Sequence, residues 1–473
     1  MSAESVHVDL CVIGAGSAGL SVAAGAVQMG ASVVLIEAGE MGGDCLNYGC
    51  VPSKALLASA KTAHGRGTGA ELGVAPVRAE VDFAAVKDHV AATIAAIAPH
   101  DSQERFEGLG VEVIRARARF VARDAVEAGG RRITARRFVI ATGSRPVLPP
   151  IPGLETVEAY TNETIFGLRA RPDHLVVIGG GPIGMEMAQA HRRLGSRVTI
   201  VEGDRALGRE DPDLAAPVVE ALRAEGVEIR EGTTVERVAA SAEGVELSLS
   251  DGPAISGTHL LVAAGRRAVP EDLGLEVAGI ETSKTGVKVD GGLRTTNRRV
   301  YAIGDAAGGA QFTHLAGYHA GLVIRSALFG LPAKASDRAI PRVTYTAPEV
   351  AQVGLTEAEA RAAHGDRLEV LSVPYSGNDR AQAEGRTAGH IKVMVVRGRP
   401  VGAGIVGAQA GELIGLWALA LSVRLKVSQV AGMVAPYPTL GELSKRAAGQ
   451  YFVPRLFENP RVRRFVRLVQ RLP

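Results

Sequence analysis

The sequence is poor in cysteine, has no long apolar run and carries no excess of one charge. Three cysteines in 473 residues cannot build the disulfide framework of a secreted protein. No run of eighteen apolar residues occurs, and the N-terminus lacks the basic and apolar segments of a signal peptide, so we expect a cytoplasmic protein. With 53 basic and 50 acidic residues interspersed, the net charge of +3 gives no indication of a nucleic-acid groove.

Glycine is abundant, and the 58 glycines include a motif typical of nucleotide binding. The apolar run 8–13 leads directly into this motif, whose glycines are Gly14, Gly16 and Gly19. A helix-compatible run follows, and then a second apolar run that ends in Glu37. The glycines let the backbone approach a pyrophosphate at a helix N-terminus, and the carboxylate binds ribose hydroxyls.

The same pattern occurs a second time, with the glycines Gly179, Gly181 and Gly184. Glu202 follows Gly179 by 23 residues, as Glu37 follows Gly14. A structural βαβ unit without a ligand would explain one copy, but two copies with both acids in place predict two dinucleotides. Glu202 would repel the 2′-phosphate of NADPH, so we expect a preference for NADH, although Arg205 lies three residues further on.

The segment MGGDCLNYGCVPSK, residues 41–54, contains Cys45 and Cys50 with four residues between them. With the two glycine motifs, ATG at 141–143 and IGD at 303–305, it makes the chain resemble the FAD-dependent pyridine nucleotide–disulfide oxidoreductases. That family includes dihydrolipoamide dehydrogenase, glutathione reductase and mercuric reductase. The resemblance implies an α/β fold with two Rossmann-like domains for FAD and NAD(P), an α+β C-terminal dimerisation domain, and a homodimer.

The expected division of the chain follows that of the family. It comprises the first part of an FAD-binding domain at 1–150, an NAD(P)-binding domain at 151–272, the second part of the FAD domain at 273–340, a dimerisation domain at 341–450 and a basic amphipathic tail at 451–473.

By motif match, the resemblance assigns a set of residues to cofactor binding. Those expected at FAD are Gly14, Gly16, Gly19, Glu37, Gly43, Lys54, Ala118, Thr142, Gly143, Ser144, Asp305 and His314. Those expected at the nicotinamide dinucleotide are Gly179, Gly181, Gly184 and Glu202. Gly265, which follows the expected strand in HLLVAAGRRAVP at 259–270, is also assigned to cofactor binding. The chain departs from the family at Ala118, where a glycine usually meets the adenosine, and at Val269, where an asparagine is common.

Spacing alone leaves Cys45 and Cys50 open to three roles, namely a structural staple, a metal clip or a redox pair. A zinc site usually has four ligands, and no other cysteine or clustered histidine lies nearby, so we expect no metal site. A staple across so short a loop would add little to so large a core. A redox pair fits best, because Pro52 indicates a helix beginning near Cys50, and the helix dipole favours a thiolate there.

The resemblance also implies roles for these residues. Cys50 would face the flavin as a thiolate, Cys45 would exchange with the substrate, and Lys54 would pair with Glu186 near the flavin. Electrons would pass between the nicotinamide, FAD and the cysteine disulfide, and the substrate would be a small-molecule disulfide, dithiol or metal ion. The expected activity is therefore that of an NAD(P)H-dependent FAD disulfide oxidoreductase.

One family motif is altered near the C-terminus. Members that use dithiols have HPTxxE there, whose histidine moves protons at the partner's active site; here Tyr437 replaces the histidine, and Glu442 keeps the acidic position. A phenol with a pKa of about 10 is a poor base at neutral pH, so Tyr437 would either bind substrate or pack at the interface. The chain most resembles a mercuric-reductase-like branch without its C-terminal cysteine pair. The alternatives are dihydrolipoyl dehydrogenase proper and a quinone or metal-ion reductase that uses the flavin directly.

The C-terminal tail has the pattern of an amphipathic helix. Its apolar face comprises Val462, Phe465, Val466 and Val469, and most arginines lie elsewhere, at Arg463, Arg464, Arg467 and Arg471. Such a helix can lie on an anionic membrane. We favour the simpler interpretation that it is a solvated terminal helix resting on its own domain.

Overall fold

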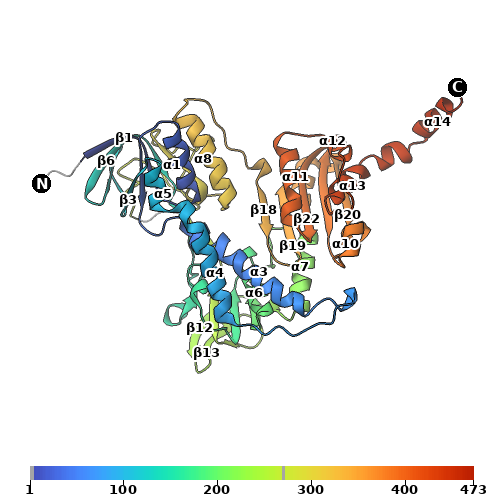
Figure 1. The fold of residues 1–473 in the computed structure, drawn as a ribbon, viewed down its shortest axis with the longest axis horizontal. Helices are drawn as coiled ribbons and strands as arrows, with labels where there is room; N and C mark the ends of the chain where they lie inside the picture. Colours follow the sequence, from blue (N-terminus) through green and yellow to red (C-terminus); the bar gives the residue numbers. More distant parts are fainter. Residues whose placement is uncertain (1–4, 269–271, 473) are drawn as a thin grey trace.

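The computed structural model describes residues 5–268 and 272–472, which form three domains and a projecting tail (Figure 1). Val269, one of the positions that depart from the family pattern, lies outside these ranges. Two α/β domains precede a C-terminal domain with an antiparallel sheet, in agreement with the predicted fold class. Within the described ranges, no helix combines the length and the apolar character needed to cross a bilayer.

The N-terminal domain contains a seven-stranded sheet, on the left in Figure 1. Its strands, in spatial order, are β3 (Glu112–Arg115), β2 (Val33–Glu37), β1 (Ser5–Ile13), β6 (Arg131–Ile140), β5 (Ala125–Ala128) and β4 (Arg119–Ala122), with β17 (Val300–Ala302) also paired to β6. Helices α1 (Ser17–Gln28) and α8 (Thr313–Ala327) lie side by side and pack on this sheet. Residues 10–13 of β1 are all buried, because alternate side chains enter apolar clusters on opposite faces.

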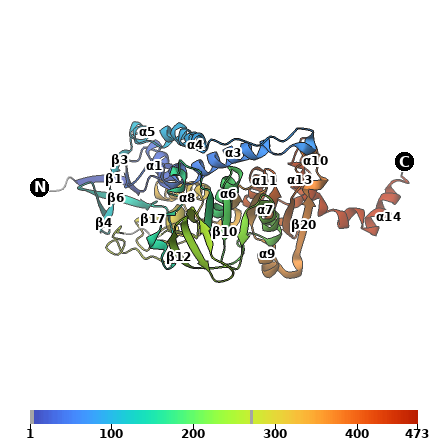
Figure 2. The ribbon, with the colours of Figure 1, turned by 90° about the horizontal axis from the view of Figure 1, so that it is seen from below.

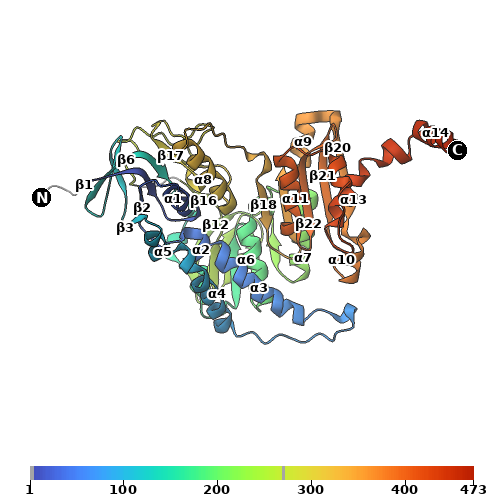
Figure 3. The same cartoon turned by 45° about the horizontal axis from the view of Figure 1, so that its top comes forward.

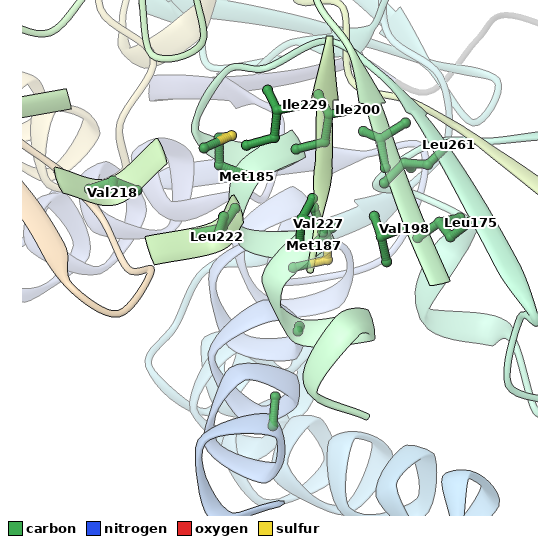
Figure 4. Packing of buried hydrophobic residues seen from close by; sticks show 14 of the residues in the cluster. Leu175, Met185, Met187, Val198, Ile200, Val218, Leu222, Val227, Ile229 and Leu261 are labelled. Carbon is green, nitrogen blue, oxygen red and sulfur yellow. The ribbon is translucent and has the colours of Figure 1, made fainter. Parts of the chain in front are cut away.

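The middle domain contains a five-stranded parallel sheet. Its order is β11 (Glu228–Arg230), β10 (Arg197–Val201), β9 (His174–Ile178), β15 (His259–Val262) and β8 (Ala159–Tyr160), and its helices are α6 (Pro182–Arg193) and α7 (Pro212–Ala224). A smaller antiparallel sheet comprises β12 (Val235–Ser241), β13 (Gly244–Leu249) and β14 (Ile255–Gly257). Figure 4 shows strand residues such as Leu175 and Ile200 packed with Met185 and Met187 of α6 and Leu222 of α7.

The chain enters and leaves the middle domain through two adjacent strands. β7 (Arg145–Pro146) pairs antiparallel with β16 (Arg266–Arg267). Both crossings therefore lie together beside the sheet of the N-terminal domain, so the middle domain is an insertion into the N-terminal one.

The C-terminal domain contains five antiparallel strands. They are, in spatial order, β18 (Pro341–Thr344), β19 (Glu349–Gly354), β22 (Arg399–Gly407), β21 (His390–Val396) and β20 (Leu368–Pro374). The helices of this domain are α9 (Glu357–His364), α10 (Asp379–Ala383), α11 (Ala410–Ser422), α12 (Val427–Ala431) and α13 (Glu442–Gln450). The core between sheet and helices is centred on the fully buried Trp417.

A helical layer connects the N-terminal and middle domains. It consists of α2 (Gly43–Asn47), α3 (Cys50–Arg66), α4 (Phe83–Ile97) and α5 (Gln103–Gly108). Helix α3 packs on both α4 and α6, and Figure 2 shows it extending toward α10. Beyond its end, Leu72 approaches the position that a side chain at Gly385, just after α10, would occupy.

A buried lysine joins the middle and C-terminal domains. The side chain of Lys392, on β21, is 5% exposed and lies 3.0 Å from Asp211, 2.6 Å from Asp213 and 2.9 Å from Glu357. Burial alone would lower the pKa of Lys392, but hydrogen bonds to the three carboxylates raise it overall. Because Asp211 and Asp213 begin α7, this cluster fixes the position of that helix against the C-terminal sheet.

The tail does not rest on its own domain, so that interpretation is wrong. Helix α14 (Pro460–Val469) has no buried residue, and Figures 1 and 3 show it extending away from the C-terminal domain. The last strong attachment is Arg455, whose guanidinium lies 2.7 Å from Glu369 of β20 and 3.6 Å from the ring centre of Tyr451. None of the described residues packs on this helix closely enough to bury one of its side chains.

Candidate active site

The first glycine motif forms a tight turn between β1 and α1. Gly14 has φ of +107°, and a Cβ there would lie 2.4 Å from the carbonyl oxygen of Ala141. A Cβ at Gly19 would lie 1.8 Å from the carbonyl oxygen of Gly14, so only glycine lets α1 begin this close to the strand. Gly16 caps α1 without a side-chain hydrogen bond, which leaves the first N–H groups of the helix available to a phosphate.

Glu37 completes this site at the end of β2. One carboxylate oxygen accepts a hydrogen bond from the Ala15 N–H at 2.5 Å, and the other accepts one from the Gly39 N–H at 2.6 Å. Gly43, which begins α2, lies so close that a Cβ on it would be 2.7 Å from the Cα of Gly16. The glycine turn, the start of α1 and the Glu37 carboxylate thus lie around a single site. This arrangement fits the pyrophosphate and ribose of a dinucleotide.

The second glycine motif has nearly the same geometry between β9 and α6. Gly179 has φ of +109°, and a Cβ at Gly184 would lie 2.0 Å from the Gly179 carbonyl oxygen. Glu202 accepts a hydrogen bond from the Gly180 N–H at 2.6 Å, as Glu37 does from Ala15. Gly181 caps α6 without a side-chain hydrogen bond, so this site also fits a dinucleotide.

The ATG and IGD segments meet at the carboxyl edge of the first sheet. Ser144 donates a hydrogen bond to Asp305 at 2.5 Å, and Arg266 donates to Ser144 at 2.8 Å. Burial raises the pKa of Asp305, while Ser144 and Arg266 oppose that rise. Thr142 is exposed at this edge, and Gly143 adopts φ of +70°.

Sequence reasoning missed a polar cluster beside this edge. Arg266 lies 3.0 Å from the carboxylate of Asp44, and Asn162 bonds to both of them. The signal was weak: Asp44 lies next to Cys45, and Arg266 follows Gly265, but neither position suggested a contact with the other. The cluster ties the helix that carries Cys45 to the two crossings between domains.

The two cysteines lie on consecutive helices, Cys45 within α2 and Cys50 at the first position of α3. The hydrogen bond from Cys45 lowers the pKa of the Cys50 thiol to about 6, with further help from Thr313 and the charge of Lys54. Hydrogen bonding to Cys50 and burial raise the pKa of the Cys45 thiol. Thr313, whose hydroxyl lies 3.3 Å from the Cys50 sulfur, is a contact that the sequence did not indicate. When the pair is reduced, these shifts favour a thiolate at Cys50 and a thiol at Cys45.

Lys54 and Glu186 form an ion pair between α3 and α6, with 2.9 Å between nitrogen and oxygen. The Glu186 side chain is only 6% exposed, and its other oxygen accepts a hydrogen bond from the backbone N–H of Tyr345 at 2.9 Å. The Lys54 ammonium also lies 4.3 Å from the centre of the Tyr345 ring. Three domains thus meet at this ion pair, one turn along α3 from Cys50.

Tyr437 lies on the C-terminal domain, and its residue is 68% exposed. Its hydroxyl donates a hydrogen bond to Asp379, at the start of α10, over 2.9 Å. This bond and the carboxylate charge raise the pKa of Tyr437. The predicted acidic partner, Glu442, has one buried oxygen with no hydrogen-bond partner among the described residues. Asp379, which sequence reasoning missed, therefore takes the orienting contact.

The remaining predicted residues lie around the first sheet. His314 is exposed on α8, and its ring donates to the Pro341 carbonyl oxygen at 2.7 Å while stacking on Phe312. Ala118 packs at the margin of the apolar cluster below this sheet. Gly265 is exposed at the crossing between domains.

Comparison with known proteins agrees with this geometry. The model of the pyridine nucleotide-disulphide oxidoreductase family matches residues 8–320, and that of the family's dimerisation domain matches residues 340–448. A mercuric reductase of Streptomyces lividans is 37% identical over 459 residues, covering 93% of this chain and 95% of the relative. A dihydrolipoyl dehydrogenase of Bacillus subtilis (strain 168) is 33% identical over 447 residues, covering 92% and 96%.

Solved structures give the same result. The HOCl-induced flavoprotein disulfide reductase RclA from Escherichia coli matches with a TM-score of 0.84 and 28% identity, over 93% of this chain and 99% of that one. LpdA from Mycobacterium tuberculosis matches with a TM-score of 0.86 and 27% identity, over 94% and 100%.

The two dinucleotide sites and the cysteine pair between them define an FAD-dependent oxidoreductase that uses a pyridine nucleotide and a redox disulfide. The chain belongs to the pyridine nucleotide-disulphide oxidoreductase family, and its dimerisation domain indicates a homodimer.

Proposed function

We propose that this chain is an NADH-dependent reductase whose Cys45–Cys50 pair carries electrons to a small-molecule disulfide or a metal ion. The observation that carries the proposal is the unequal acidity of the two thiols beside the Lys54–Glu186 ion pair. FAD, when bound, supplies the two-electron step between a nicotinamide and a disulfide.

The chain's own residues account for the form of the reduced pair. Opening the disulfide takes two electrons and one proton, and leaves one thiol and one thiolate. The hydrogen bond from Cys45 favours the thiolate at Cys50, with help from Thr313, the charge of Lys54 and the helix start, while Cys45 retains the proton. Cys45, once deprotonated, is then the nucleophile that exchanges with a substrate sulfur or binds a metal ion.

The ion pair gives Lys54 a fixed position. Its charge lowers the pKa of Cys50, and Glu186 keeps the ammonium in place through a carboxylate that is itself held by the Tyr345 N–H. In the proposed enzyme, the buried Glu186 thus positions Lys54 beside the flavin and the thiolate.

Tyr437 favours an acceptor that needs no basic group from the enzyme. Its hydroxyl proton is engaged by Asp379, so its oxygen can accept a hydrogen bond or bind a cation but cannot take up a proton at neutral pH. Oxidation of a dithiol requires such a base, whereas reduction of a metal ion does not. The proposal therefore lies nearer to mercuric reductase than to dihydrolipoyl dehydrogenase, both of which occur among the relatives.

NADH is the proposed electron donor. Glu202 lies where the adenosine ribose would bind, and Asp204 adds a second acid next to it. The guanidinium of Arg205, a nearby group that would attract a 2′-phosphate, donates instead to the carbonyl oxygens of Gly208 and Glu210 at 3.3 Å.

The proposal keeps the division of the chain into an FAD domain at 1–150 and 273–340, an NAD domain at 151–272 and a dimerisation domain at 341–450. It also keeps a cytoplasmic location, where NADH is available.

A panel of acceptors and donors tests the function. The FAD-loaded protein would be reduced with NADH and offered mercuric ion, oxidised glutathione, lipoamide, quinones and oxygen, and NAD⁺ would be offered with dihydrolipoamide. We expect turnover with a disulfide or metal ion, and its loss in both Cys45→Ser and Cys50→Ser. Turnover that is unchanged in Cys45→Ser with every acceptor would show that the flavin reacts directly with the acceptor.

A further inference from the structure

A largely buried arginine lies beside the turn that joins the two cysteines. The side chain of Arg266, on β16, is only 13% exposed. Its guanidinium donates to the hydroxyl of Ser144 at 2.8 Å, to the carbonyl oxygen of Ser144 at 2.9 Å and to the side-chain oxygen of Asn162 at 3.1 Å. One of its nitrogens also lies 3.0 Å from the carboxylate of Asp44. These contacts give the guanidinium one fixed position.

The carboxylate of Asp44 lies close to both ends of the cysteine turn. Asp44 directly precedes Cys45 in the chain. A Cβ on Gly49, the residue before Cys50, would lie 2.8 Å from the Oδ2 atom of Asp44 and 3.0 Å from its carbonyl oxygen. The absence of a side chain at Gly49 therefore lets the carboxylate fold back over the residue that precedes the second cysteine.

Asn162 fastens the middle of the same turn. Its side chain donates to the Oδ1 atom of Asp44 at 3.0 Å and to the carbonyl oxygen of Tyr48 at 3.2 Å, and it accepts from Arg266. Asn162 is 7% exposed, so these hydrogen bonds are shielded from water. The turn between the cysteines is thus anchored through Asp44 and Tyr48 to the segments that enter and leave the middle domain.

As an anchor for this turn, Asp44 has a charge of the wrong sign. The hydrogen bond from Cys45 does most to lower the pKa of the Cys50 thiol, and the charge of Asp44 acts against that lowering. Burial raises the pKa of Asp305, where Arg266 opposes the rise and Asp44 adds to it. Opposite charges 3.0 Å apart largely cancel at the distance of a third group. The carboxylate can therefore anchor the turn at little electrostatic cost only while the arginine is beside it.

We propose that Arg266 is a positioning residue of the redox centre. It neutralises Asp44, so that this carboxylate holds the cysteine turn without destabilising a thiolate at Cys50. The inference rests on the proposed redox role of Cys45 and Cys50, but it does not depend on which acceptor the enzyme uses.

Substituting either member of the Asp44–Arg266 pair tests this through the disulfide equilibrium. The full-length, FAD-loaded protein is equilibrated at pH 7 with mixtures of reduced and oxidised dithiothreitol, so that opening the protein disulfide is balanced by closing the reagent's own. After an acid quench, alkylation under denaturing conditions and mass spectrometry give the fractions of Cys45 and Cys50 present as thiols. Arg266→Gln leaves a carboxylate unpaired near the thiolate, whereas Asp44→Asn leaves a guanidinium unpaired. We expect the equilibrium constant for reduction to fall at least about threefold in Arg266→Gln and to rise at least about threefold in Asp44→Asn.

Three further variants separate charge from packing. Asp44→Asn combined with Arg266→Gln removes both charges, and Arg266→Lys keeps the positive one. Arg145→Gln removes a positive charge from an exposed position on β7, the strand that pairs with β16. We expect all three constants within about twofold of the unmodified protein, because the charges balance or are screened by solvent.

The signs of the two single variants decide the outcome. If the pair were only a mechanical anchor, Arg266→Gln and Asp44→Asn would shift the equilibrium in the same direction. That result, or unchanged constants in both variants, would overturn the inference while leaving the proposed function intact. An unmodified protein that forms no disulfide at any ratio of the reagent would instead refute the redox role of the two cysteines.

Discussion

Replacing Cys45 by alanine should raise the pKa of the Cys50 thiol and reduce its reactivity at neutral pH. The hydrogen bond from Cys45 is the largest cause of the lowered pKa of Cys50, ahead of Thr313 and Lys54. Alanine removes the donor, whereas serine keeps a hydroxyl in the same place. Cys45→Ala and Cys45→Ser therefore form a matched pair: both abolish the disulfide, but only the alanine variant loses the hydrogen bond.

The size of the effect follows from the thiolate fraction. A thiol with a pKa of about 6 is about 90% ionised at pH 7, whereas one at 9.0 is about 1% ionised. Thr313 and Lys54 remain in the variant, so we expect a pKa of about 7–8 and a thiolate fraction at pH 7 of about 10–50%. Because the pKa is lowered in the folded protein, the thiolate is present above pH 6 and is lost as the pH falls through that value.

Alkylation measures this directly. The reduced, FAD-loaded protein would be treated with iodoacetamide between pH 5 and 9.5, and modification of the Cys50 peptide would be quantified by mass spectrometry. We expect the midpoint of the rate near pH 6 in the unmodified protein, a little higher in Cys45→Ser, and at least one pH unit higher in Cys45→Ala. A midpoint near pH 6 in Cys45→Ala would refute the assignment of the low pKa to this hydrogen bond.

Three further substitutions test other parts of the structure. Tyr437→His should raise the NAD⁺-dependent oxidation of dihydrolipoamide at least about tenfold, since general acid–base catalysis contributes about 10²–10⁴-fold; an unchanged rate would show that proton transfer there is not limiting. Glu202→Gln should move the ratio of kcat/KM for NADPH over NADH upward about tenfold, and a constant ratio would remove the charge argument for NADH. Lys392→Met should destabilise the protein by about 3–5 kcal/mol in urea denaturation, because Asp211, 4% exposed, would keep a buried charge without its partner. Adding Asp211→Asn to Lys392→Met should restore part of the lost free energy of unfolding, because it removes the unpaired buried charge. If it restores none, the destabilisation comes from altered packing.

The sequence was sufficient to predict features set by local pattern. Both glycine turns were predictable because a tight strand-to-helix turn near a phosphate excludes any Cβ, as Gly14 and Gly19 show. The two carboxylates were predictable because Glu37 is the last residue of β2 and Glu202 directly follows β10, the strands that come after these turns. In both cases, the residue types and their spacing over about twenty-five positions are enough to predict that the glycine turn and the carboxylate lie together.

Contacts between distant segments could not be predicted in the same way. Cys50 and Thr313 are 263 positions apart, and their contact depends on how α8 returns to the first sheet. Asp379 replaces Glu442 as the partner of Tyr437 because the turn before α10 comes close to the Tyr437 loop, where Asn378 donates to the Thr439 carbonyl oxygen at 3.0 Å. Such juxtapositions follow from the packing of whole elements, which no local pattern records.

The contacts around Lys54 limit which domains of relatives could replace the middle domain of this enzyme. Glu186 of α6 accepts from the Tyr345 N–H, and Gln189, one turn further, both donates to and accepts from the backbone of Ala347, at 2.8 Å each. These two side chains of the middle domain thus recognise backbone groups of a neighbouring domain, whatever side chains that segment carries. A chimera that receives the middle domain of a relative would therefore keep the position of that domain against the neighbouring domain only if the inserted domain has a Glu and a Gln at these two positions. The recipient chain must also have the lysine that pairs with the Glu. Domain exchange within the family is therefore expected to succeed or fail on three side chains, two on α6 of the middle domain and one on α3.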